Sequence, residues 1–330
     1  MDRIIIWGTG HTYELLRSYI REIENEGKIQ IVKYVSKVIV PEIDGHPVIS
    51  SSELLHEDYD LILICAETEQ AFDIEKEIKS LGIAVDKVNY AIEYLKANSS
   101  LGKDYSEIVH KQCEVLSKIL HSTDCEISSY EWMYERICEY GIYPFKELED
   151  PRIFKTLFGI LQTVEEFTEY CNYLSTLSVK TALEIGVFKG RSSYLMCAIL
   201  ARKNPELEYF CVDIFDNMDS FDEYQKVLPM LQKCIPNTSK DYKNKEFDFV
   251  FIDGDHSYDG SIDDYNNVGQ YANVITVFHD IYGHEYDGKN GGVVRTWEEV
   301  QARTPQCNHR VFSKYPGKWM GIGVVEWGNH

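Results

Sequence analysis

The stretch TALEIGVFKGRSS, at residues 181–193, decides the fold of this chain. Its first five residues predict a short, mostly apolar strand that carries Glu184 within it. Gly186 and Gly190 then predict a turn, and the apolar run at 194–200 predicts the helix that follows. A strand, a glycine turn and a helix N-terminus together form a place where the backbone can approach a ligand closely. The spacing E-x-G-x-x-x-G differs from the dinucleotide-binding pattern G-x-G-x-x-G.

Three further strands are predicted after this turn, and each runs into acidic residues. YFCVDI (209–214) carries Asp213 near its end, while FDFVFIDGDH (247–256) and NVITVFHD (273–280) end in carboxylates and a histidine. In an open α/β sheet, ligands bind beyond the carboxyl ends of the strands, and an acid after the second strand can accept hydrogen bonds from ribose hydroxyls. The sequence therefore predicts that four strand ends meet at one ligand-binding crevice.

These motifs resemble those of the class I S-adenosylmethionine-dependent methyltransferases. The resemblance rests, in chain order, on ALEIGVFKGRSS, VDIF, FDFVFIDGDHSYDG, VFHDI and GGVVRTWEEV. It covers the chain from Pro151 onward and is strongest to bacterial O-methyltransferases that act on sugars and natural products, relatives of the catechol type. The resemblance implies a sheet that ends in an antiparallel hairpin, formed by strands at 309–314 and 321–327 that join near Pro316.

For the methyl donor, the resemblance implies a site around the glycine turn. Gly186 and Gly190 would let the backbone approach the amino-acid end of S-adenosylmethionine, and Glu184 would polarise or hydrogen-bond nearby groups. Asp213 would hold the ribose hydroxyls; the alternative is that it only makes a turn bond at the strand end. The predicted donor-binding residues are Glu184, Gly186, Gly190, Asp213, Ile214 and Asp253, with Ile214 against the adenine.

A divalent cation is the second predicted cofactor. Asp253 and Asp280 end neighbouring predicted strands, and with His279 they could share Mg²⁺ or Mn²⁺. The catechol type carries Asp-Asn where this chain has His279-Asp280, and imidazole suits Mn²⁺, Fe²⁺ or Zn²⁺ better than Mg²⁺. The alternative is a metal-free acid/base pair of His279 and Asp280.

His256 is the predicted catalytic base. It follows Asp253 by three residues, where the resemblance places a base that is a lysine in the catechol type. An imidazole with a pKa near 6.5 can accept a hydroxyl proton at neutral pH. The alternative is an exposed histidine in a polar loop.

The N-terminal part of the chain predicts a smaller domain of the same class. Apolar strands at 3–7, 29–35, 61–65 and 84–88 alternate with helices, which indicates a parallel, doubly wound sheet. IIIWGTG, IDGHPVIS and YDLILICAE resemble the small Rossmann-like modules at the front of bacterial sugar-modifying and glycan-assembly enzymes.

This module departs from a nicotinamide-binding site in two places. Tyr13 stands at the third glycine position, where its bulk should hinder packing of the helix against the turn. Ser36-Lys37 follow the second strand, where an acidic ribose ligand would stand. A structural or partner-docking role is favoured for the module, and a nicotinamide-dependent sugar oxidoreductase is one alternative function for the chain.

The predicted fold class is α/β, with two doubly wound Rossmann-like domains joined by a helical segment. The domains are 1–97 and 151–330, and the joining segment is 98–150, with ANSSLGK (97–103) as its linker. Helical spacing at 108–120, 129–140 and 163–174 predicts helices that could pack on the catalytic sheet, cover the crevice or form a homo-oligomer contact.

Composition excludes several function classes. A formal net charge of −21 over 330 residues argues against nucleic acid or an anionic membrane as a partner. No apolar run reaches 18 residues, so no membrane span is predicted. Nine cysteines without a C-x-x-C pair, together with the missing signal peptide, indicate a reducing, cytoplasmic location.

The sequence thus predicts an S-adenosylmethionine-dependent O-methyltransferase, divalent-metal-assisted, with a hydroxyl of a sugar or glycan-biosynthesis intermediate as acceptor. A non-catalytic scaffold that binds the cofactor is the other alternative. One segment fits poorly, because residues 227–245 show no clear apolar run for a third strand. The adenine side of the pocket could therefore be remodelled.

Overall fold

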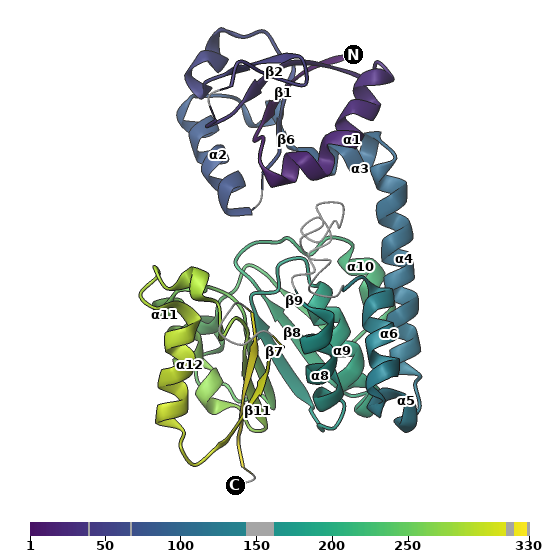
Figure 1. Ribbon diagram of the computed structural model, residues 1–330, viewed down its shortest axis with the longest axis vertical. Coiled ribbons are helices and arrows are strands. Elements are labelled where there is room, and N and C mark those ends of the chain that lie inside the picture. The colour runs from purple at the N-terminus through teal and green to yellow at the C-terminus, as the bar shows by residue number, and fades with distance from the viewer. Residues whose placement is uncertain (39, 67, 143–161, 315–319, 329–330) are drawn as a thin grey trace. The chain divides into compact units, whose positions relative to one another are not determined.

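The computed structural model describes all residues except 39, 67, 143–161, 315–319 and 329–330. The chain divides into two compact units, Met1–Ile108 and Val109–His330, each built on its own sheet (Figure 1). The α/β fold class predicted for both parts is confirmed. Of the predicted domain boundaries, the one at 150/151 lies outside the described residues.

The first unit contains a six-stranded sheet in the order β3-β4-β2-β1-β5-β6. All its strand pairs are parallel except β3–β4. The strands are β1 (Asp2–Trp7), β2 (Ile29–Val35), β3 (Glu42–Ile43), β4 (His46–Ile49), β5 (Leu61–Ile64) and β6 (Val88–Tyr90). The helices are α1 (His11–Asn25), α2 (Thr68–Ser80) and α3 (Ala91–Asn98), with 3₁₀ helices at Ser51–His56 and Val85–Lys87.

One strand prediction for this unit was wrong, and one hairpin was not predicted. The strand predicted at 84–88 begins only at Val88, because the polar pair Asp86-Lys87 lies in a 3₁₀ turn. The β3–β4 hairpin was not predicted, although Asp44-Gly45 at its tip is a favoured hairpin turn with both residues at positive φ, 52° and 82°.

Tyr13 does not hinder α1 as predicted, because the hairpin accommodates it. The Tyr13 ring is buried, and its hydroxyl bonds the Tyr34 hydroxyl at 2.9 Å and donates to Asp44. Arg17 Nε and Arg21 Nη2 donate to the same carboxylate, at 2.9 and 2.6 Å. A polar cluster therefore lies beside the first helix, with the two tyrosines buried and the two arginines reaching the surface.

Helices open the second unit, and three of them were predicted. The helices are α4 (Leu101–Leu120), α5 (Asp124–Ser128), α6 (Tyr130–Tyr140) and α8 (Val164–Leu174), and all of these except α5 were predicted. The helix α4 begins in the first unit and continues into the second without a break. The predicted linker at 97–103 is mostly helical, because only Ser99 and Ser100 separate α3 from α4.

The second unit contains a seven-stranded sheet in the order β12-β13-β11-β10-β7-β8-β9. Its first five strands in the chain run parallel, and β13 and β12 form the predicted antiparallel hairpin at one edge. The strands are β7 (Thr181–Ile185), β8 (Glu208–Val212), β9 (Leu231–Cys234), β10 (Phe249–Ile252), β11 (Ile275–Phe278), β12 (Asn308–Phe312) and β13 (Ile322–Glu326). The order reverses at β7, so the carboxyl ends of β7 and β10 lie at a topological switch point, where ligands bind in open α/β sheets.

The doubt about the third strand was wrong. LQKC, at Leu231–Cys234, pairs parallel with β8 as β9. It is an edge strand with only its first residue fully buried, so its sequence lacks the apolar run of a central strand. The adenine side of the sheet is therefore complete.

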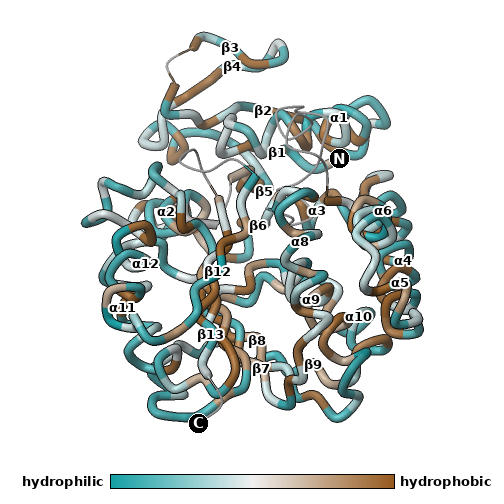
Figure 2. Tube along the Cα trace, turned by 60° about the horizontal axis from the view of Figure 1, so that its bottom comes forward, coloured by the Kyte–Doolittle hydropathy of each residue, from teal (hydrophilic) through white to brown (hydrophobic). Residues whose placement is uncertain are grey.

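Helices cover both faces of this sheet. In Figure 1, α8 and α9 (Arg191–Lys203) lie on one side of the strands and α11 (Tyr258–Asn267) and α12 (Gly292–Arg303) on the other. Figure 2 shows hydrophobic residues along strands of this sheet, among them β13, whose first four residues are buried. The remaining elements are α10 (Phe221–Val227) and 3₁₀ helices at Ser239–Tyr242, Gly269–Tyr271 and His284–Tyr286.

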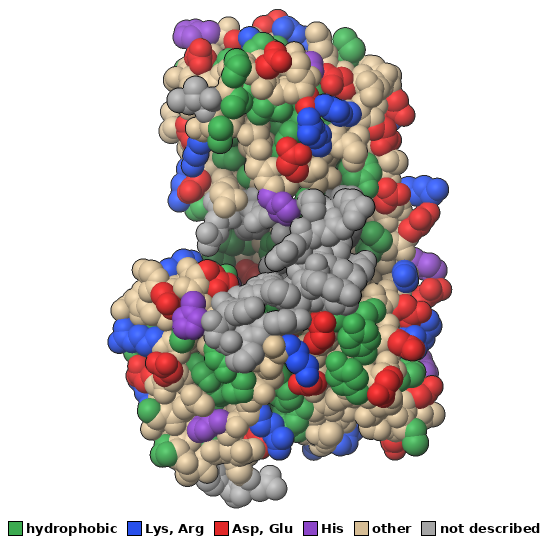
Figure 3. Space-filling model, viewed as in Figure 1, with side chains coloured by type: hydrophobic (Ala, Val, Ile, Leu, Met, Phe, Trp, Pro, Cys, Tyr) green, Lys and Arg blue, Asp and Glu red, His purple; other side chains and the backbone are tan. Residues whose placement is uncertain are grey.

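Among the described residues, no helix is long and apolar enough to cross a membrane. Figure 3 shows acidic and basic side chains interspersed over one face of the molecule.

Candidate functional site

The register of the second sheet brings the predicted site residues to one edge. Ile185 pairs with both Val212 and Ile252, and Ile252 also pairs with Phe278. The residues that follow these paired positions are Gly186, Asp213, Asp253 and His279. The four predicted strand ends therefore stand side by side at the carboxyl edge.

The two glycines are required by the geometry of the turn. Gly186 has φ 81°, and a Cβ there would lie 2.1 Å from the carbonyl oxygen of Asp253. Gly190 has φ 77°, and a Cβ there would lie 2.6 Å from Met218 Cε. Any side chain would therefore be both strained and overpacked.

Asp213 is tied to the glycine turn by backbone amides. Its Oδ2 accepts from the amides of Val187 and Phe188 at 3.1 and 3.0 Å, and its Oδ1 accepts from the amide of Phe215 at 3.1 Å. The Asn237 amide, just after β9, donates to the Asp213 carbonyl at 3.0 Å. The turn-bond role is thus present, and it fixes the carboxylate for any further partner.

An apolar surface follows Asp213. The side chains of Ile214 and Phe215 are 55% and 40% exposed, although most large hydrophobic residues of this unit are buried. Both belong to the loop between β8 and α10, on the adenine side of the predicted crevice. Exposed apolar groups beside a carboxylate at a strand end suit a flat aromatic ligand that also carries hydroxyl groups.

Glu184 lies inside the sheet instead of lining the crevice. Its side chain is completely buried, and the Tyr209 hydroxyl donates to its Oε2 at 2.6 Å. Burial raises the pKa of Glu184 to about 8, although the bond from Tyr209 opposes the shift. The folded protein therefore favours the protonated acid around neutral pH.

Replacing Glu184 with Gln should change how stability depends on pH. Because the folded pKa is raised above the ordinary 4.5, the contribution of Glu184 is fully present at low pH and is lost as pH rises toward 8. We expect the stability difference between Glu184→Gln and wild type to shift toward the variant by up to about 1.4 kcal/mol per pH unit in that window. Urea unfolding at pH 5 and pH 8 measures this, and a pH-independent difference would contradict it.

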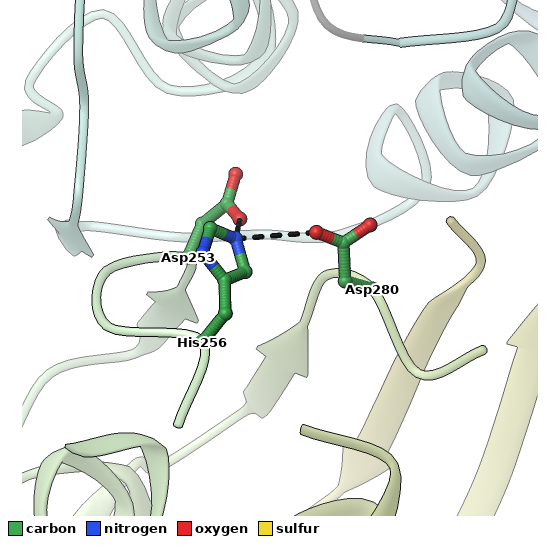
Figure 4. A group of neighbouring side chains, drawn as sticks. All are labelled: Asp253, His256 and Asp280. Carbon is green, nitrogen blue, oxygen red and sulfur yellow. Dashed lines mark ion pairs between the residues drawn. The ribbon is translucent and has the colours of Figure 1, made fainter. Parts of the chain in front are cut away.

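Asp253, His256 and Asp280 form a compact group at the ends of β10 and β11 (Figure 4). Their ligand atoms lie within 4.8 Å of one another. His256 Nε2 is 3.1 Å from Asp280 Oδ2 and 3.5 Å from Asp253 Oδ1. Asp280 has φ 58°, a left-handed conformation that aspartate tolerates and that is frequent at functional sites.

His279 reaches the same carboxylates from inside the protein. Its Nδ1 lies 3.3 Å from Asp253 Oδ1 and 3.4 Å from Asp280 Oδ1. Its Nε2 is 3.2 Å from Oε1 of the buried Gln162, which orients the ring. His279 is only 5% exposed, whereas His256 is 27% exposed.

The charges of this cluster shift the pKa values of its own side chains. Burial on its own lowers the pKa of His256 and of His279, but the two carboxylates outweigh it and raise both, that of His256 to about 9. Burial opposes the shift of Asp280, yet the two histidines hold its pKa well below the usual range. In the cation-free protein, the carboxylates therefore favour the protonated form of both imidazoles.

Two further residues of this site were not predicted. Gln162 contacts His279 from 117 positions away in sequence, and no local pattern signals such a contact. Tyr286 stacks on the His256 ring with centroids 4.5 Å apart and an interplanar angle of 12°. An aromatic residue in the polar loop after β11 was the only available signal.

Comparison with protein families identifies both parts of the chain. Residues 183–281 match the family described as methyltransferase domain, and residues 1–89 match the family described as C2185-like, N-terminal. The matched methyltransferase segment contains the glycine turn, Asp213 and the histidine–carboxylate cluster. Part of the second unit therefore matches a methyltransferase domain, in agreement with the predicted enzyme class.

Solved structures with a similar fold include three O-methyltransferases. One from Bacillus cereus, in complex with SAH, is 14% identical, covers 65% of this chain and 96% of its own, and has a TM-score of 0.39. The O-methyltransferase TomG from Streptomyces achromogenes, involved in tomaymycin synthesis and in complex with SAM, is 17% identical. The match covers 47% of this chain and 77% of TomG, with a TM-score of 0.34. A putative caffeoyl-CoA O-methyltransferase from Staphylococcus aureus is 13% identical, and the match covers 60% of this chain and 99% of that protein with a TM-score of 0.39. Comparison with curated proteins finds no match.

Proposed function

We propose that the second unit transfers a methyl group from S-adenosylmethionine to a hydroxyl of a sugar or glycan-biosynthesis intermediate, assisted by a divalent cation. The observation that carries this proposal is the cluster of two carboxylates and two histidines beside the glycine turn. The acceptor class rests on the sequence resemblance of both parts of the chain. The polar, histidine-bearing cluster is compatible with a hydroxyl acceptor.

The donor fits the crevice between β7 and β10. Gly186 and Gly190 let the turn pack closely on Asp253 and Met218, and the backbone of this compact turn would face the amino-acid end of the donor. Asp213, already fixed by three amides, would accept from the ribose hydroxyls, and Ile214 would contact the adenine. Asp253 borders this site through its carbonyl, which meets Gly186.

The cluster also fits a divalent cation. Asp253 and Asp280 supply oxygen ligands from neighbouring strand ends, and His279, oriented by Gln162, supplies an imidazole nitrogen. This mixed set suits Mn²⁺ better than Mg²⁺. A bound cation of this kind lowers the pKa of a hydroxyl that contacts it.

His256 is the histidine placed to act as base. It is more exposed than His279, and Tyr286 holds its ring against the edge of the cluster. With a cation bound to the two carboxylates, His256 would be neutral, because the added positive charge lowers the pKa of an imidazole. The acceptor hydroxyl would then give its proton to His256, its oxygen would form the bond to the methyl carbon, and the carbon–sulfur bond of the donor would break. His256 Nε2 could instead bind the cation, since it lies within reach of both carboxylates.

Titration calorimetry and product analysis test the proposal. We expect S-adenosylmethionine to bind, methyl transfer to a hydroxyl acceptor to stop in EDTA, and Mn²⁺ to restore it. Donor binding without transfer to any acceptor would favour the scaffold alternative. Full activity in EDTA would exclude a role for the cation in the reaction.

Variants of the two histidines separate base from ligand. We expect His256→Ala to lower kcat by about 100-fold or more while Mn²⁺ affinity changes little. His279→Ala should instead weaken Mn²⁺ binding by at least about tenfold. Electron paramagnetic resonance of Mn²⁺ measures both affinities, and a large loss of affinity in His256→Ala would reassign His256 as a ligand.

The first unit offers less support for the oxidoreductase alternative. Ser36 follows β2, where a ribose-binding acid would stand, and its hydroxyl bonds Thr9 in the β1–α1 turn at 2.7 Å. We infer a structural or partner-docking role for this unit. NADH fluorescence quenching that Gly10→Trp abolishes would contradict this inference.

A further inference from the structure

An arginine is completely buried at the start of α9, directly after the glycine turn. The Arg191 side chain has no exposed surface, although burying a guanidinium is costly and a helix N-terminus disfavours a cation. A position with two such penalties needs a specific anionic partner. That partner is Asp219.

Asp219, in the loop after β8, forms ion pairs with two cationic side chains from the region of the glycine turn, Lys189 and Arg191. Arg191 Nη2 donates to Asp219 Oδ1 at 2.6 Å, and Lys189 Nζ lies 3.7 Å from Asp219 Oδ2. The guanidinium also lies over the Tyr224 ring of α10, 4.8 Å from its centroid. The pair is largely sheltered from water, because Asp219 is 17% and Lys189 14% exposed. Ionic contacts of this kind are screened less than surface pairs.

The loop between β8 and α10 is therefore held at both ends. Asp213 fixes its start through the amides of Val187 and Phe188. At its other end Asp219 bonds Arg191, and Met218 packs where Gly190 lacks a Cβ. Between these two points the loop presents the exposed side chains of Ile214 and Phe215.

We propose that Asp219, through Arg191 and Lys189, is a positioning residue that fixes this loop for the adenosine end of the methyl donor. The proposal rests on the donor site proposed above. Asp219 contacts the turn and not the donor, so its loss should weaken donor binding and leave the transfer step almost unchanged. Holding the loop before binding lowers the entropy cost of ordering it.

The same chemical change three residues earlier provides a matched control. Asp216 lies in the same loop, but its ion pair with Lys233, at 2.9 Å, is exposed, and Asp216 is 56% exposed itself. We expect Asp219→Asn to raise the Kd of S-adenosylhomocysteine by at least about tenfold, and Asp216→Asn to change it less than twofold. Asp219→Glu should recover part of the loss, because it restores the charge.

Three measurements keep the outcomes distinct. Titration calorimetry gives the Kd of S-adenosylhomocysteine. In steady-state kinetics, Asp219→Asn should raise the KM for the donor, while kcat and the KM for the acceptor stay within about twofold of wild type. Amide hydrogen exchange at residues 214–218 should be faster in Asp219→Asn but not in Asp216→Asn. If Asp219→Asn does not fold, Lys189→Met tests the same anchor with Arg191 retained. Equal Kd values for Asp219→Asn and Asp216→Asn would overturn the proposal. Failure of the wild type to bind would instead overturn the donor site itself.

Discussion

Replacing Asp280 with Asn should lower kcat/KM by about 1,000-fold or more. Asp280 is 10% exposed and contacts both histidines, at 3.1 Å from His256 and 3.4 Å from His279. The amide keeps the shape but removes one of two carboxylates, so cation affinity falls and the proton-accepting histidine loses its orienting partner. Kinetics at saturating donor, together with Mn²⁺ titration, measure the two effects.

The same change should also destabilise the protein. His279 is buried, and in the cation-free protein its Nδ1 lies 3.3 Å from Asp253 and 3.4 Å from Asp280, whose carboxylates raise its pKa well above the usual value. Removing one counter-charge leaves it poorly compensated, at a cost of about 3 kcal/mol in the free energy of unfolding.

Asp255→Asn is the control for this prediction. Asp255 lies in the loop after β10, next to His256, is exposed, and its Oδ1 accepts a hydrogen bond from the Ser257 amide at 2.9 Å. Its replacement should leave kcat/KM within about threefold, as expected of a surface substitution. If Asp280→Asn retains more than a tenth of wild-type activity, the cluster is not the catalytic centre.

Replacing Gly186 with Ala should abolish donor binding and destabilise the fold by about 4 kcal/mol. The residue has φ 81°, and the new Cβ would stand 2.1 Å from a backbone carbonyl that a rotamer change cannot move away. Relief requires β7 and β10 to separate at their carboxyl ends, where Asp253 begins the cluster. Urea unfolding and calorimetry with S-adenosylhomocysteine measure the two losses.

Gly288→Ala is the matched change at a glycine without such constraints. Gly288 is exposed, and a Cβ there would meet nothing within 4 Å. Stability and donor affinity should both stay close to wild type. Similar effects of the two substitutions would mean that the turn relaxes more easily than its geometry indicates.

The sequence predicted the central sheet because buried parallel strands are continuous apolar runs. FVFI and ITVF, at β10 and β11, contain no polar residue that faces water, so their ends and the carboxylates that follow could be placed. The edge strand β9 was missed because only its first residue is fully buried. Strand pairing at an edge depends on the neighbouring strand, which a local pattern does not show.

The side-chain arrangement of the site was less predictable. The histidines at 256 and 279 were both singled out, but their separate exposures follow from side-chain directions in the folded protein. The Arg191–Asp219 pair spans 28 positions, and GRSS gave no reason to expect a buried cation. Glu184 was expected near the ligand because it precedes the glycine turn, yet strand alternation directs it into the core beside Tyr209.

The uninterrupted helix α4 determines how this protein can be divided for study. The division between units, after Ile108, falls in the middle of twenty helical residues and not in a loop. A fragment that starts at Val109 would lose the first turns of that helix, yet Gln112, whose amide donates to the Tyr140 carbonyl at 2.9 Å, needs its own turn intact. An expression boundary at Ser99 or Ser100, between α3 and α4, would keep the whole of α4 together with the second unit.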